Sequence, residues 1–221
     1  CIGRSGGSDF GKDVMPALLG NRKMWTHRFS GYWRDVGTIS SYFEANMDAF
    51  RAGSGLDLDA WETCTRIDSQ LPGDLPPSGF DPAAACRQVL AAGGCRIGGE
   101  VQRTVLSPEV QIGAGARVEN SILMNGVVVE PGAQVRCAIL DKKVRVGRGA
   151  VIDGREGGQA GVVNAGYAKC DLDGIVVIGA GAEVPSGTRL GHDVVLESGV
   201  GEEDFAGDVP PGGTIEKSTR S

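Results

Sequence analysis

The residues with the clearest chemical potential form one short stretch, Trp33-Arg34-Asp35, just before a Gly37-Thr38 pair. A carboxylate at the end of a strand can ligate a hard cation such as Mg²⁺, and an aromatic ring can pack on a sugar. A simpler interpretation is a buried strand-turn-helix in which Asp35 caps the backbone. The spacing alone favours that simpler interpretation, and Trp33 suits core packing equally well.

A helix is expected directly after this stretch, because Ser41-x-x-Glu44 has the form of a capping box for a helix that continues through Phe50. Further upstream, Asp9 is expected to cap a helix that ends at Gly20. Residues 23–29 are expected to form a strand. Together these elements would position Trp33, Arg34 and Asp35.

The second half of the chain repeats with a period of seventeen residues, in rows that start at Gly93, Val110, Val127 and Val144. Large apolar residues recur about every six positions within a row, which is the hexapeptide pattern of a parallel β-helix. Gly115, Gly132 and Gly149 are expected at turns with positive φ. Residues at equivalent positions of successive rows are expected to stack inside the β-helix as columns. The apolar columns are Val101-Val118-Val135-Ile152, Val105-Ile122-Ile139, Leu106-Leu123-Leu140, Val110-Val127-Val144 and Cys95-Ile112-Val129-Val146. A column of small residues, Gly99-Ala116-Ala133-Ala150, is expected where a corner leaves little room.

The remaining segments are expected to be a linker, a loop and a C-terminal cap or tail. Residues 52–92 are rich in Gly, Pro and Asp and are expected to be a linker with one short helix over Pro82–Ala92. Residues 153–174 are Gly-rich and polar and predict a loop that leaves the β-helix. The apolar pattern resumes at Ile175, and residues after Gly199 are expected to form a cap or a frayed tail.

The composition limits the classes of function. The net charge is -6 and there is no basic run, which argues against a nucleic-acid partner. No apolar run reaches the length of a membrane span. The six cysteines include no CxxC pair, so neither a zinc site nor a disulfide framework is expected. Buried, reduced thiols in a cytoplasmic protein are expected instead. The chain opens without Met or a signal-peptide pattern and is interpreted as the C-terminal piece of a longer protein.

The string GYWRDVGT at Gly31–Thr38, the EANMD ending at Asp48, and the segments Ser121–Met124 and Ala138–Lys142 resemble bacterial glucose-1-phosphate adenylyltransferases, also called ADP-glucose pyrophosphorylases. The resemblance implies the end of an α/β nucleotidyltransferase domain followed by a left-handed parallel β-helix of the hexapeptide-repeat type. The expected boundaries are 1–51 for the nucleotidyltransferase end, 52–92 for the linker, 93–199 for the β-helix and 200–221 for the cap or tail.

The same resemblance implies a reaction, in which ATP and α-D-glucose 1-phosphate give ADP-glucose and pyrophosphate with Mg²⁺, for glycogen biosynthesis. Asp35 falls on a Mg²⁺ ligand of the family, and Trp33 falls on an aromatic residue near the glucose phosphate. Arg34 could reach a phosphate, although a structural role suits it better. Arg136 lies in a neighbourhood that corresponds to a sugar-phosphate effector site, although a lone outward arginine is more often simply solvated. A homo-tetramer is also implied.

One departure from the family matters, because the glycine-rich nucleotide loop, a second metal-binding Asp and a sugar-phosphate Lys have no match here. The chain alone is therefore expected to be inactive. Two other functions stay open. A regulatory subunit without catalysis would keep the same fold, and a hexapeptide acyltransferase would need a histidine general base, for which His27 and His192 are the candidates.

Overall fold

The computed structural model describes residues 9–60, 75–157 and 162–218. The chain divides into two compact units, Cys1–Tyr32 and Trp33–Ser221. In the first unit Asp9 caps a helical segment, and its Oδ1 accepts a hydrogen bond from the Lys12 amide at 2.7 Å. The segment consists of a π-helix, η1 (Phe10–Val14), and α2 (Met15–Leu18). The predicted N-cap is confirmed, but the strand predicted over 23–29 is wrong because no ladder partner pairs with it among the described residues.

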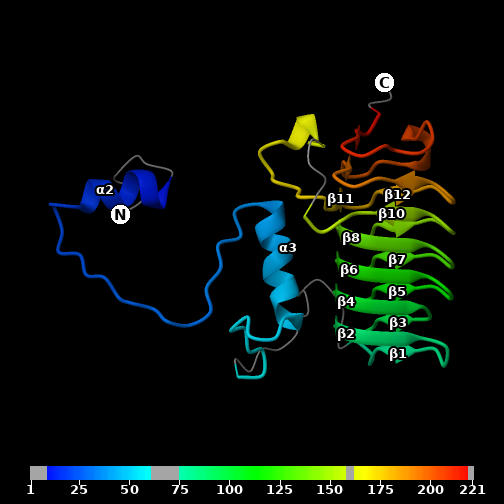
Figure 1. Ribbon diagram of the computed structural model, residues 1–221, viewed down its shortest axis with the longest axis horizontal. Coiled ribbons are helices and arrows are strands. Elements are labelled where there is room, and N and C mark those ends of the chain that lie inside the picture. The colour runs from blue at the N-terminus through cyan, green and yellow to red at the C-terminus, as the bar shows by residue number, and fades with distance from the viewer. Residues whose placement is uncertain (1–8, 61–74, 158–161, 219–221) are drawn as a thin grey trace. The chain divides into compact units, whose positions relative to one another are not determined.

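The second unit is a parallel solenoid of short strands with one helix packed on its side (Figure 1). One face is a six-stranded sheet in the order β1-β3-β5-β7-β9-β12. Its strands are β1 (Gly79–Phe80), β3 (Arg96–Ile97), β5 (Gln111–Ile112), β7 (Val128–Val129), β9 (Arg145–Val146) and β12 (Glu183–Val184).

A nine-stranded sheet supplies the other two faces, and all of its strand pairs are parallel. The central strands bend at one residue with positive φ, such as Asn120 or Cys137, both with φ of 45°. Each seven-residue strand therefore crosses a corner of the solenoid. The strands are β2 (Ala85–Ala91), β4 (Glu100–Leu106), β6 (Arg117–Leu123), β8 (Gln134–Leu140), β10 (Val151–Asp153), β11 (Val176–Ile178), β13 (Arg189–Leu190), β14 (Val195–Leu196) and β15 (Thr214–Ile215).

The solenoid begins earlier than the repeat pattern predicted. β1 and β2 lie within the segment expected as a linker, and β2 pairs with β4 in parallel. The helix predicted over Pro82–Ala92 is wrong, because β2 gains ladder hydrogen bonds and packs Val89 against the solenoid core. After Gly199 the chain also stays in the stack, since β15 pairs with β14.

Most predicted columns are buried inside the solenoid, including Val118 at 1 % exposure. One assignment is wrong, because Ile97 and not Cys95 pairs with Ile112. The corner between β3 and β4 consists only of Gly98 and Gly99, which shortens that coil. A Cβ at Gly99 would lie 2.3 Å from the Ala116 carbonyl oxygen, so this corner excludes larger residues.

The column Val105-Ile122-Ile139 lies outside the solenoid, contrary to the expectation that it stacks inside. α3 (Ile39–Met47) covers this column, and Phe43 and Met47 are buried against Ile122 and Ile139. A 3₁₀ turn, η2 (Asp48–Phe50), ends the helix at the predicted residue. The column thus serves as the docking surface for the helix that follows the candidate site.

Between β10 and β11, the described residues 154–157 and 162–175, here called the excursion loop, lie outside the two sheets. Both strands pair with β8, on either side of its corner residue Cys137. The loop therefore replaces one corner of a coil. A loop that leaves the β-helix was expected over 153–174, and it starts one residue later because Asp153 belongs to β10. It contains the short 3₁₀ helix η3 (Ala165–Tyr167), and a second one, η4 (Glu202–Asp204), lies in the last coil.

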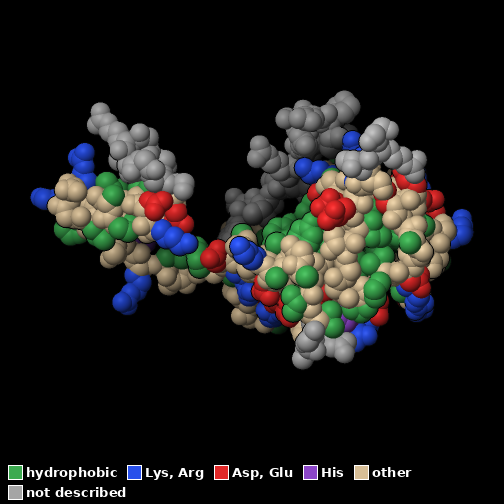
Figure 2. All heavy atoms as spheres, turned by 90° about the horizontal axis from the view of Figure 1, so that it is seen from above, with side chains coloured by type: hydrophobic (Ala, Val, Ile, Leu, Met, Phe, Trp, Pro, Cys, Tyr) green, Lys and Arg blue, Asp and Glu red, His purple; other side chains and the backbone are tan. Residues whose placement is uncertain are grey.

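Charge is mixed over the surface. In the view of Figure 2, acidic and basic side chains lie interspersed around the solenoid. Within the described residues, no helix combines the length and the apolar character that crossing a membrane requires. The four described cysteines, Cys86, Cys95, Cys137 and Cys170, are free thiols, whereas Cys1 and Cys64 lie outside the described residues.

Candidate functional site

The candidate site residues lie in the segment that leads into α3. Trp33 is 75 % exposed, at the start of the second unit. Asp35 is exposed, and among the described residues no hydrogen bond or ion pair occupies its carboxylate. Within the second unit, both side chains are therefore accessible to a ligand.

Arg34, between these two residues, has a structural partner. Its guanidinium lies 2.9 Å from the Asp48 carboxylate, which is only 2 % exposed. Arg51 pairs with the same carboxylate at 3.0 Å and with Glu44 at 2.7 Å. A buried carboxylate requires such partners, because an unpaired charge away from water is strongly unfavourable. The ion pair holds Arg34 at the carboxyl end of α3. The backbone of Asp35, the next residue, is thereby restrained on one side.

The other side of Asp35 is anchored by the cap of α3. The capping box is formed by Thr38 and Ser41, not by Ser41 and Glu44 as predicted. Thr38 Oγ1 accepts the Ser41 amide at 3.1 Å, and Ser41 Oγ accepts the Thr38 amide at 2.9 Å. Serine replaces the usual glutamate of the box, so the Ser-x-x-Glu pattern falls three residues after the actual N-cap. Asp35 thus lies between the Arg34 ion pair and the Thr38 cap.

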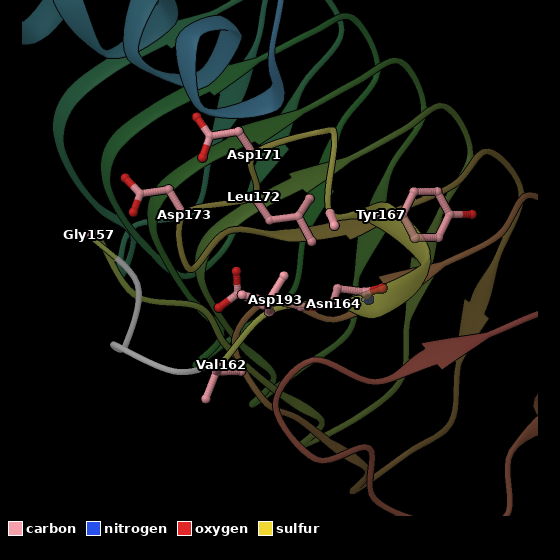
Figure 3. Close-up of a pocket in the computed structure, with 10 residues that line it drawn as sticks. Gly157, Val162, Asn164, Tyr167, Asp171, Leu172, Asp173 and Asp193 are labelled. Carbon is pink, nitrogen blue, oxygen red and sulfur yellow. Dashed lines mark hydrogen bonds between the residues drawn. The ribbon is translucent and has the colours of Figure 1, made fainter.

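A pocket of about 310 Å³ lies where the excursion loop returns to the solenoid (Figure 3). Asp171 and Asp173 line it from the loop, and Asp193 lines it from the last coils. Burial raises the pKa of the Asp173 carboxyl, and the nearby Asp171, Asp193 and Glu44 raise it further. Among the described residues, no group of three His, Cys, Asp or Glu side chains is arranged to hold a metal ion. The pocket is acidic but is not a candidate metal centre.

Arg136 lines a separate groove of about 290 Å³ on the outer face of the solenoid, together with Arg117 and Arg189. Its guanidinium is in an ion pair with Asp153 and donates to the Gly154 carbonyl at 3.2 Å. Arg117 pairs with Glu100 at 3.2 Å. Carboxylates therefore offset two of the three positive charges. Among the described residues, no hydrogen bond or ion pair joins Arg136 to Trp33, Arg34 or Asp35.

The two histidines do not form an acyltransferase site. His192 is 2 % exposed, and its Nδ1 lies 2.7 Å from Asp193 Oδ2 inside the last coils. A general base must reach its substrate, and a side chain enclosed in this way lacks that access. His27 belongs to the first unit and not to the solenoid, where an acyltransferase cleft would lie.

Two family models match successive parts of the chain. One is described as "Nucleotidyl transferase" and matches residues 4–51, which include Asp35 and α3. The other is described as "GlmU-like, C-terminal hexapeptide" and matches residues 80–159, which include the coils from β2 to β10. With the parallel coils, these matches confirm a nucleotidyltransferase end followed by a parallel β-helix, and the hexapeptide match agrees with the left-handed type.

Curated relatives agree with both matches. The chain is 34% identical over 201 residues to the glucose-1-phosphate adenylyltransferase of Acetivibrio thermocellus, covering 89% of this chain and 45% of the relative. It is 37% identical over 207 residues to that of Thermomicrobium roseum, covering 93% and 47%. It is 44% identical over 112 residues to that of Geobacillus stearothermophilus, covering 50% and 28%. The chain thus spans less than half the length of these relatives, and the resemblance to their C-terminal portion is confirmed.

Proposed function

We propose that this chain, which matches the C-terminal portion of glucose-1-phosphate adenylyltransferases, is part of an enzyme that makes ADP-glucose for glycogen biosynthesis. In that reaction a phosphate oxygen of α-D-glucose 1-phosphate attacks the α-phosphorus of ATP, and pyrophosphate leaves. The observation that best supports this proposal is the exposed carboxylate of Asp35, which has no hydrogen bond or ion pair among the described residues and lies in the segment that the nucleotidyl transferase family model matches.

In this proposal Asp35 holds Mg²⁺. The ion would offset phosphate charge and align the two substrates for in-line attack. Mg²⁺ is commonly bound by one or two carboxylates together with phosphate oxygens and water, so a single exposed carboxylate suits it. The Arg34–Asp48 ion pair and the Thr38 cap would keep Asp35 in place before the substrates bind.

Trp33 and Arg34 have separate proposed roles. The exposed ring of Trp33 would pack beside the glucose phosphate, since apolar ring faces bind sugars well. Arg34 could reach a phosphate, since its side chain is 34 % exposed and its guanidinium carries more donors than the ion pair with Asp48 uses. Its pairing with Asp48 supports a structural contribution in addition to that contact.

The test is pyrophosphate release from ATP and glucose 1-phosphate with Mg²⁺, measured for this chain and for a longer protein that contains it. We expect turnover only from the longer protein, because no segment here matches the family's nucleotide loop. Turnover by the chain alone would contradict the expected inactivity. A longer protein that folds but makes no ADP-glucose would instead favour the regulatory subunit.

We also propose the groove around Arg136 as a site for a sugar-phosphate effector. Support comes from the three arginines that line it, Arg117, Arg136 and Arg189, and the partial neutralisation of two of them predicts weak binding. In the longer protein, Arg136→Gln should weaken activation by sugar phosphates while the activity without effector stays unchanged. The same activation curve in both proteins would remove Arg136 from the effector site.

Two further properties follow from the family resemblance and are proposed with it. The longer protein is expected to assemble as a homo-tetramer, which light scattering would measure. It is expected in the cytoplasm, where ATP and glucose 1-phosphate are available, and the free thiols of the described cysteines agree with a reducing compartment.

A further inference from the structure

The first turn of α3 depends on the excursion loop for its hydrogen bonds. The first amides of a helix have no acceptor within the helix itself. Here the Ile39 amide donates to the Cys170 carbonyl at 2.9 Å, and the Ser40 amide donates to the Asp171 carbonyl at 3.0 Å. Ser40 Oγ also donates to Asp171 Oδ2 at 2.5 Å. The loop therefore makes three hydrogen bonds to two successive residues of the helix.

The loop is itself fastened to the last coils of the solenoid. Asn164 is 2 % exposed, and its Nδ2 donates to the carbonyls of Asp193 and Gly213, each at 3.1 Å. At the other end of this stretch, the Gly174 amide donates to Asp193 Oδ1 at 2.9 Å. The stretch 164–174 is thus held at both ends, and Asp171 lies between the two attachments.

Figure 3 shows the same arrangement, with Asp171 on the side of the pocket nearest the helix and with Asn164 and Asp193 close together on the opposite side. Asp171 has a φ of 51°, a left-handed conformation that aspartate tolerates better than most residues. This conformation, together with the attachments of the loop, lets one residue present its carbonyl oxygen and its carboxylate to Ser40.

The apolar contacts of α3 cannot fix its position by themselves. Phe43 and Met47 pack on aliphatic side chains of the solenoid, and such burial is favourable over a range of small shifts and rotations. Hydrogen bonds depend on distance and angle and therefore select one placement. Only two residues, Val36 and Gly37, separate Asp35 from the Thr38 cap, so a shift of the first turn carries Asp35 with it.

From these contacts we propose that Asp171 is a positioning residue for the metal-binding carboxylate of Asp35. It acts through Ser40 and the first turn of α3, and the excursion loop thereby connects the last coils of the β-helix to the nucleotidyl-transfer site. The positioning role rests on the function proposed above, whereas the hydrogen-bonded connection itself does not.

The first experiment measures the connection in this chain by amide hydrogen exchange of Ile39 and Ser40. Asp171→Gly removes the carboxylate without strain at positive φ, and Ser40→Ala removes the partner hydroxyl. Both variants should speed exchange at these amides by about tenfold or more, because the first turn then opens more readily. Asp171→Asn keeps an acceptor oxygen and should restore slow exchange. Asp173→Asn is the matched control, because it removes a carboxylate two residues away that has no hydrogen bond to α3 among the described contacts. Its repulsion with Glu44 is relieved, so exchange at Ile39 and Ser40 should not become faster.

The second experiment measures turnover of the longer protein across a Mg²⁺ titration. Asp171→Gly should lower kcat by about tenfold and raise the Mg²⁺ concentration for half-maximal activity, because a small displacement of a catalytic group is costly. Asp171→Asn should stay within about twofold of the parent, and so should Asp173→Asn.

The possible failures are distinguishable. If Asp171→Gly speeds exchange but leaves kcat and the Mg²⁺ dependence unchanged, the positioning role is overturned while the proposed function stands. Unchanged exchange in both Asp171→Gly and Ser40→Ala overturns the connection. A folded longer protein without ADP-glucose synthesis overturns the proposed function and the positioning role together, and the exchange data still decide whether the loop holds the helix.

Discussion

Asp35 lies just before α3 and Asp48 lies just after it. The surroundings of these two carboxylates suit them to different roles. Asp48 is buried and carries ion pairs to Arg34 and Arg51, which hold the segment against the end of α3. Asp35 is exposed, and no described partner occupies it. A carboxylate that is anchored nearby but unpaired is suited to ligate a cation, whereas a paired one is suited to structure.

Replacing Asp35 tests the residue that carries the proposed chemistry. In the longer protein, Asp35→Asn keeps the size and removes the charge, and turnover should fall by about a hundredfold or more, equivalent to about 2.7 kcal/mol. The melting temperature should change little, because the side chain is exposed and has no described partner to lose. Steady-state kinetics across a Mg²⁺ titration, together with a melting curve, would measure both effects. Near-normal activity at every Mg²⁺ concentration would show that Asp35 is not a metal ligand.

Asp173 should make stability depend on pH. Its pKa is raised by burial and by the neighbouring carboxylates Asp171, Asp193 and Glu44. Because the pKa of Asp173 is higher in the folded than in the unfolded state, the folded state holds this proton more tightly. The resulting contribution of Asp173 to the free energy of unfolding is fully present below the unfolded pKa, near 4, and is lost as pH rises through the folded pKa. Asp173→Asn should therefore raise the melting temperature at pH 7, and the difference from the parent should vanish under acid conditions. Asp59→Asn, at an exposed position, serves as the control. An equal rise in its melting temperature would show that the surroundings of Asp173 are not the cause.

At the scale of elements, α3 connects the candidate site to the solenoid. Its buried residues Phe43 and Met47 cover the outward column that contains Ile122 and Ile139. Its first turn is capped by Thr38 internally and by the excursion loop externally. The helix is therefore held by apolar burial along its side and by directional hydrogen bonds at its amino end, and these two kinds of contact have different consequences when they are removed.

Truncating Met47 tests the apolar contact. Met47 is fully buried, and Met47→Ala should cost about 2–5 kcal/mol of helix docking or unfolding free energy, from lost transfer energy and the resulting cavity. Denaturant unfolding followed by circular dichroism, with amide exchange along α3, would measure it. Asn46→Ala on the half-exposed side of the helix should cost less than about 1 kcal/mol. Equal costs for the two variants would mean that α3 does not dock as described.

At the scale of the whole solenoid, stability comes from stacking of inward aliphatic columns from one coil to the next. Val118 is 1 % exposed and lies between Val101 and Val135 in register. Val118→Asp would bury a charge without a partner and should cost at least several kcal/mol. Gln111→Asp places the same charge at an exposed strand position and should melt close to the parent. If thermal unfolding of Val118→Asp matched that of the control, the stacking would be disproved.

The sequence alone determined the solenoid and most of its interior. The period of seventeen, the inward columns and the turn glycines Gly115, Gly132 and Gly149 all follow from residue types at fixed spacing, and positive φ at those glycines is confirmed. The first coil was missed because its short strands at 79–91 lie among Pro and Gly residues, and their ladder partners are fifteen to seventeen residues away. Local composition there favours a linker, whereas the pairing energy is supplied by the next coil.

Only the tertiary structure decided how the site is supported. The sequence singled out Asp35, Trp33 and Arg34, but it could not assign Asp48 as the partner of Arg34 or Asp171 as the partner of Ser40. The adjacent apolar pairs Val105-Leu106, Ile122-Leu123 and Ile139-Leu140 carried a usable signal, because neighbouring strand residues face opposite sides and one of each pair must be covered from outside. Which element covers it depends on contacts between residues far apart in the chain, and periodicity does not encode them.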